Sequence, residues 1–123
     1  MVRTEANPPK NTGGAYTLAP LTGGGTSSPG TEQFGINLVA NTSPATFGAN
    51  PVQVPDNTFS FGVVATGYDT PNNYRYNKGD IIAKSLKSTS VTIYTISYLY
   101  NISSTTPAGE YQFNHDLVAT ATY

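Results

Sequence analysis

The side chains with the widest chemical scope in this sequence are one histidine and a few carboxylates. His115 is the only histidine and cysteine is absent, so the usual zinc ligands are missing. We therefore expect His115 to be a structural or surface residue. Asp69 to Asp80 contains oxygen donors that suit calcium, although ordinary turn formation explains the same residues. No two acids are singled out as a catalytic pair, and we expect no catalytic residue, no metal and no cofactor.

A group of tyrosines offers a different kind of chemistry, because a tyrosine ring combines an apolar face with a polar tip. Tyr68, Tyr74 and Tyr76 lie close together in a turn-rich part of the sequence. They are candidates for a platform that binds a glycan or a protein. The alternative is that they pack against neighbouring strands, which aromatic side chains commonly stabilise.

Two kinds of covalent modification fit the residues present. The sequons Asn41-Thr42-Ser43 and Asn101-Ile102-Ser103 would mark exposed turns if they carried glycans. A Lys–Asn isopeptide bond would need a buried lysine, an asparagine and an acid close together, which the sequence alone does not place.

The composition indicates strands and turns with uncharged polar faces. The 123 residues suffice for one domain. Charged residues make up 11%, against about 25% in typical soluble proteins, and polarity comes from 18 Thr, 11 Asn and 10 Ser. Threonine favours strands, whereas asparagine and serine favour turns. The net charge of −1 and the scattered basic residues argue against a nucleic-acid partner.

The first 31 residues have the composition of an arm that precedes the domain. The glycine-rich run at 23–30 is typical of a linker. Within the arm, residues 15–21 form a possible donor strand, in which Tyr16 and Leu18 alternate and Leu21 follows Pro20. We expect such an arm to be held either by its own domain or by a neighbouring copy.

Residues 32–123 are expected to form a β-domain, because alternating segments are separated by turn signals and none has a helical period. About seven strands are expected, at 33–39, 52–54, 59–65, 74–76, 80–84, 90–101 and 109–123. The last two segments are predicted to pair as a hairpin. The pattern predicts an all-β fold, an antiparallel sandwich or a barrel. No apolar run approaches the roughly 18 residues needed to span a bilayer.

One part of the sequence resembles a known group of proteins. Thr106-Pro107-Ala108-Gly109-Glu110-Tyr111, with the alternating Leu117 to Tyr123, resembles the closing strand of secreted bacterial coat-type and pilin-like modules. The segments 32–38 and 90–103 are similar to parts of uncharacterised surface proteins of small-genome bacteria. The resemblance implies an immunoglobulin-like β-sandwich, a secreted location and a role in adhesion or assembly, although the cysteines of many such modules are missing here.

These features together predict a non-catalytic module on the bacterial cell surface that associates with itself. Pilin-like modules lend an N-terminal strand to the next subunit, which implies a pilus or filament joined through Tyr16, Leu18 and Leu21. The alternative is an adhesin-type module that binds a glycan or a host protein through its tyrosine-rich loops. An enzyme such as a glycan hydrolase would need two acids facing each other across a cleft.

Overall fold

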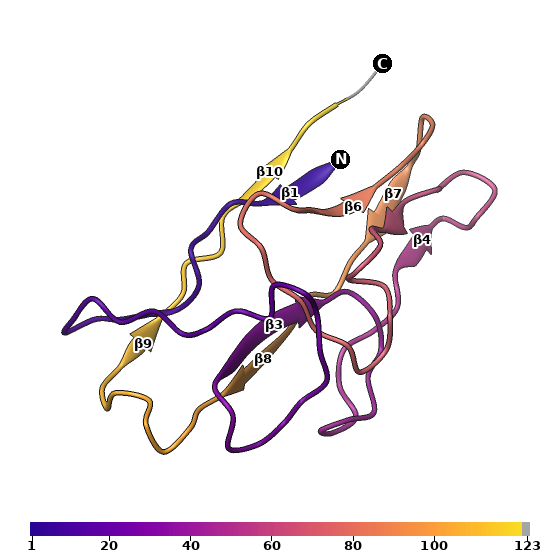
Figure 1. Ribbon diagram of the computed structural model, residues 1–123. Helices are drawn as coiled ribbons and strands as arrows, with labels where there is room; N and C mark the ends of the chain where they lie inside the picture. The colour runs from indigo at the N-terminus through magenta and orange to yellow at the C-terminus, as the bar shows by residue number, and fades with distance from the viewer. Residues whose placement is uncertain (122–123) are drawn as a thin grey trace.

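The computed structural model describes residues 1–121, and every regular element in that range is a β-strand (Figure 1). The all-β prediction is confirmed. None of the described residues forms a helix long and apolar enough to cross a membrane. The strands, in chain order, are β1 (Val2–Thr4), β2 (Lys10–Asn11), β3 (Gln33–Asn37), β4 (Val52–Val54), β5 (Val63–Val64), β6 (Ile81–Lys84), β7 (Val91–Ile93), β8 (Ser97–Asn101), β9 (Tyr111–Gln112) and β10 (Leu117–Ala119).

The strands form one sheet of four and three antiparallel pairs. The larger sheet has the order β10-β1-β6-β5, and the pairs are β2 with β9, β3 with β8, and β4 with β7. The expected number of about seven strands is not confirmed. The residues expected as one strand at 90–101 are divided between β7 and β8, and those at 109–123 between β9 and β10.

The predicted hairpin between the last two segments is wrong. β8 pairs with β3, whereas β9 and β10 pair with β2 and β1 near the start of the chain. The reason is visible in the packing of their side chains. The ring of Phe34 on β3 lies 5.1 Å from Tyr100 and 4.9 Å from Phe113, centroid to centroid, so the two segments meet through aromatic side chains.

The first 31 residues belong to the folded domain. β1 lies between β10 and β6, and Figure 1 shows β1 beside β10, so the first strand of the chain pairs with the last. Leu18 is buried in the main apolar cluster, and Pro20 forms a parallel bridge with Phe34. Of the two expected alternatives, the structure shows the segment held by its own domain, so it is not a unit separate from residues 32–123. The glycine-rich run at 23–30 is a connecting loop, and β1, β2 and Leu18, which precede it, contribute to the sheets and the core.

The core is centred on β3, whose five residues are all buried. Gly35 allows the next segment to approach closely, because a Cβ at that position would lie 2.8 Å from the Cβ of Tyr74. The backbone of Ile36 then exchanges hydrogen bonds of 2.9 and 3.1 Å with Arg75. The main apolar cluster consists of Leu18, Phe34, Ile36, Leu38, Tyr68, Tyr76, Ile82 and Ala83.

Candidate functional site

The three tyrosines considered as a binding platform are core residues. Tyr68, Tyr74 and Tyr76 are each at most 1% exposed. Their hydroxyl groups donate to the Asp80 carboxylate at 2.7 Å, to the Ser43 carbonyl at 2.8 Å and to the Ala6 carbonyl, respectively. Burial raises the pKa of all three phenols, and for Tyr68 the bond to Asp80 raises it further. Because the rings are enclosed, the prediction of a surface platform at these positions is corrected.

The three residues considered for strand donation lie within their own chain's fold. Leu18 is buried, and its backbone N–H donates to the Pro9 carbonyl at 2.9 Å. Tyr16 is half exposed, and its hydroxyl lies 2.8 and 2.9 Å from the two Glu32 carboxylate oxygens. Leu21 is half-buried, and its backbone N–H donates to the Phe34 carbonyl at 2.8 Å. Donation to a neighbour stays a prediction.

The acidic residues considered for calcium or catalysis are placed in turns and in a solvated groove. Asp80 accepts from Asn77 at 3.2 Å and lies 3.5 Å from Arg75 Nε, while Asp69 accepts from the Gly67 N–H at 3.3 Å. Within residues 1–121 no three His, Cys, Asp or Glu side chains gather closely enough to hold a metal ion. An open groove of about 480 Å³ is lined by charges of both signs, with residues such as Glu5, Asp116, Lys10 and Lys78.

His115 forms part of a chain of hydrogen bonds that runs from the surface into the core. Tyr98 Oη lies 2.7 Å from Nδ1, and Thr4 Oγ1 lies 2.7 Å from Nε2. Thr4 donates onward to Tyr76 Oη at 3.0 Å, and Tyr76 donates to the Ala6 carbonyl. Every group donates once if the imidazole is neutral and carries its proton on Nε2. A second ring proton, on Nδ1, would point at the Tyr98 hydroxyl, which could then no longer donate its hydrogen bond to that nitrogen.

We expect the free energy of unfolding to fall as the pH drops below about 6.5, the ordinary pKa of histidine. Burial lowers the pKa of His115, and the Asp116 carboxylate opposes this only in part. The unfolded chain therefore binds more protons than the folded chain between the lowered pKa and about pH 6.5. The contribution of the neutral His115 to the free energy of unfolding is complete above about pH 6.5 and is lost as the pH falls to the lowered pKa. Urea unfolding between pH 5 and 8 should show that the free energy of unfolding of the intact chain falls more steeply with decreasing pH than that of His115→Gln. The same pH dependence in both proteins would contradict a buried, neutral His115.

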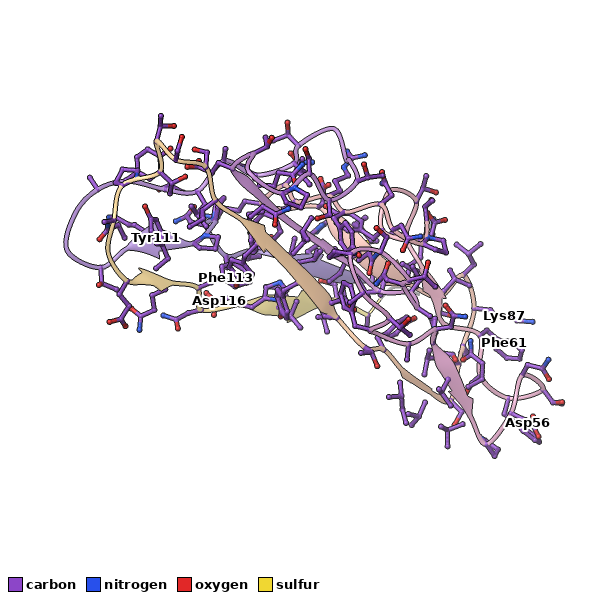
Figure 2. All side chains as sticks on the ribbon, turned by 90° about the horizontal axis from the view of Figure 1, so that it is seen from below. Asp56, Phe61, Lys87, Tyr111, Phe113 and Asp116 are labelled. Atoms are coloured by element: carbon purple, nitrogen blue, oxygen red, sulfur yellow. The ribbon has the colours of Figure 1, made fainter. Side chains whose placement is uncertain are left out.

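A half-exposed aromatic face lies beside this hydrogen-bond chain. Tyr98 and Tyr100 project from the same side of β8, and both are half exposed. Tyr98 packs against His115 and Phe113, with ring centroids 5.6 and 5.9 Å apart. Figure 2 shows Phe113 with Tyr111 and Asp116 along the C-terminal segment, far from Phe61 and Lys87 at the other end of the molecule. The sequence spacing of Tyr98 and Tyr100 is that of two residues on one face of a strand, but nothing in the sequence singles them out as exposed.

The free edge of the four-stranded sheet is formed by β10. Met1 and Thr120 exchange two hydrogen bonds of 2.8 Å, and Glu5 donates to the Asp116 carbonyl at 3.0 Å. In an antiparallel ladder, hydrogen-bonded and non-hydrogen-bonded pairs alternate. Val118, which is opposite Arg3, therefore turns its main-chain groups toward β1. The N–H and C=O groups of Leu117 and Ala119 consequently point away from the sheet.

At the opposite edge of the same sheet, side-chain hydroxyl groups bind the main chain of β5 and of the two residues before it. The Tyr94 hydroxyl donates to the Val63 carbonyl at 3.4 Å. Thr92 Oγ1 accepts from the Gly62 N–H at 3.1 Å, and Thr89 Oγ1 accepts from the Phe61 N–H at 2.7 Å. Among the described residues no comparable cap is recorded for β10. The β10 edge therefore offers main-chain hydrogen-bonding groups to another strand, whereas side chains already bind such groups at the β5 edge.

The strand β10 also exposes apolar side chains. Leu117 and Val118 are 48% and 46% exposed, and residues 117–121 contain no charge and no proline. Natural sheets usually protect a free edge with a lysine, a proline or a bulge. Comparison with known protein families, curated proteins and solved structures finds no match for this chain. The geometry of the edge is thus the main guide to function.

Proposed function

We propose that this chain is a non-catalytic structural module of an extracellular bacterial surface assembly, with an immunoglobulin-like β-sandwich, and that it joins to copies of itself. The observation that carries the proposal is the edge of β10, where main-chain groups without a partner among residues 1–121 lie beside the half-exposed Leu117 and Val118. Strand addition at such an edge supplies main-chain hydrogen bonds for affinity and side-chain contacts for register.

A second apolar surface supports the same proposal. On the ribbon of β4 and β7, Val52 is opposite Ile93 and Val54 is opposite Val91, and all four side chains are exposed. The other side of this ribbon is fixed by polar bonds, including one of 2.5 Å from Thr92 Oγ1 to the Gln53 side chain. Contiguous apolar patches on a soluble protein commonly mark interaction sites.

The way in which copies join differs from the N-terminal strand donation that the resemblance implies. Residues 1–31 already fill their positions in their own chain, so donation would require copies to exchange this segment. Addition at the β10 edge requires no such exchange. An extracellular location agrees with the Thr-, Asn- and Ser-rich composition, and it rests on that composition and on the resemblance.

The proposal predicts that the intact chain forms oligomers or filaments as its concentration rises. Light scattering over a concentration series, with electron microscopy of the most concentrated samples, measures this directly. A single monomer mass at every concentration would contradict assembly. It would favour the second candidate, a module that binds a glycan or protein through the half-exposed Tyr98 and Tyr100 on β8.

A further inference from the structure

We infer that β10 pairs with β10 of a second copy, antiparallel, about a two-fold axis that passes at Val118. The inference rests on the proposed self-association and identifies the surface through which it occurs. The pairing would join two four-stranded sheets into one continuous sheet of order β5-β6-β1-β10 followed by its symmetry mate. Figure 1 shows β10 beside β1, on the side away from β6.

The register follows from the main-chain groups that β10 leaves free. Leu117 and Ala119 point their N–H and C=O groups outward, as the alternation of bonds with β1 requires. Two antiparallel copies overlap along the whole of β10 only in one register. Leu117 of each copy is then opposite Ala119 of the other. Both pairs are then hydrogen-bonded pairs. Val118 is opposite Val118 of the second copy as the non-hydrogen-bonded pair between them.

This register also avoids placing like charges opposite each other near the edge. Asp116 falls opposite Thr120 of the second copy, so the two Asp116 carboxylates do not face each other across the pair. Like charges placed directly opposite would destabilise a pairing of this kind. The contact is self-complementary, which is the requirement for a two-fold interface.

The apolar surroundings of the edge fit an added strand. An apolar cavity of about 210 Å³ lies against the sheet and is lined by Leu117 and its neighbours, among them Val2, Leu38, Tyr94 and Ile96. In the inferred pairing, the methyl group of Ala119 of the second copy lies beside the half-exposed Leu117. Pairing therefore removes apolar surface from water, which favours association.

The contact is small, and this determines the kind of association expected. β10 has three residues, whereas a stable dimer buries about 800 Å² on each partner. The isolated two-fold contact is therefore weak and reversible. It becomes durable in an assembly where further contacts hold the copies close together.

Cysteine trapping tests the pairing at its centre. In a non-hydrogen-bonded antiparallel pair the Cα atoms are about 4.5 Å apart, within the range that a disulfide spans. The chain has no cysteine, so Val118→Cys introduces a single thiol. Val63→Cys on β5 is the matched control, because Val63 is 45% exposed and Val118 46%. Under mild oxidation we expect a disulfide-linked dimer from Val118→Cys, in large excess over any from Val63→Cys.

A charge at the same position gives an independent measurement. Val118→Lys should weaken self-association by about tenfold or more, because like charges juxtaposed across an interface are strongly unfavourable. Val63→Lys should leave it unchanged, and both variants should unfold cooperatively on heating. A chain that associates, but neither cross-links at position 118 nor responds to Val118→Lys, would overturn the edge pairing and leave the proposed function standing. A chain that is monomeric at every concentration would overturn both.

Discussion

Deletion of residues 1–30 should unfold the remaining chain. The deletion removes β1 from the middle of the four-stranded sheet, so β10 loses the strand with which it pairs and β6 loses one of its two neighbours in that sheet. It also removes Leu18 from the apolar core. Circular dichroism and thermal melting of residues 31–123 should show no cooperative transition. A truncated chain that melts like the intact one would instead mean that the first 30 residues are a dispensable arm.

Single substitutions within residues 1–30 can distinguish the stability contributed by core packing from that contributed by surface contacts. Leu18 is 2% exposed and Tyr16 is 40% exposed, although they are only two residues apart. Leu18→Ala should cost about 2–5 kcal/mol, a large part of the 5–15 kcal/mol typical of a whole domain. Tyr16→Ala should cost much less, because its ring is half exposed and its bond to Glu32 lies at the surface. Equal losses in urea unfolding would contradict the buried position of Leu18.

The same deletion can test whether the segment acts between chains. If a synthetic peptide of residues 1–30 restores the cooperative transition of residues 31–123, the segment can be supplied in trans, as strand donation requires. If the peptide has no effect, the segment contributes to stability only as part of its own chain.

The local residue pattern is enough to predict the all-β class of the fold. It is not enough to predict which strands pair with each other. Threonine-rich alternation and frequent turn residues predict strands wherever they occur, and the all-β prediction depends on nothing else. The pairing of β10 with β1 joins Thr4 to Leu117, across nearly the whole chain. Strands of two to five residues carry too little pattern to specify such distant partners.

The misassigned residues show a related limit. A linker-like composition hides Leu18, since one buried leucine between glycine-rich stretches has no periodic pattern around it. Tyr68 and Tyr76 can be buried because the Asp80 carboxylate and the Ala6 carbonyl accept hydrogen bonds from their hydroxyl groups. Tyrosine suits both a core and a surface, so only the tertiary partners decide. The uncharged alternation at 117–121 predicts a strand, but it does not indicate that this strand lies at the edge of a sheet.

A pair of buried asparagines provides the second large effect, and it was not evident from the sequence. Asn37 and Asn41 are at most 2% exposed, and their amides exchange hydrogen bonds of 2.6 and 2.9 Å. Asn41 Oδ1 also accepts from the Asn72 backbone at 2.9 Å, and Asn41 Nδ2 donates to the Val39 carbonyl at 3.0 Å. Although Asn41 begins a sequon, its side chain in the folded protein is enclosed and committed to these bonds.

Asn41→Ala should therefore destabilise the domain severely. The substitution leaves Asn37 Oδ1 and the Asn72 N–H without these partners, whereas Asn37 Nδ2 keeps its bond of 3.2 Å to the Asn73 carbonyl. Each unsatisfied buried group costs about 1–3 kcal/mol. We expect a loss of about 3–5 kcal/mol in urea unfolding. The matched control is Asn50→Ala, because Asn50 is exposed and accepts a single bond of 3.0 Å from the Ala40 N–H, which water can replace. If both variants lost the same stability, the buried amide pair would not be the source of the effect.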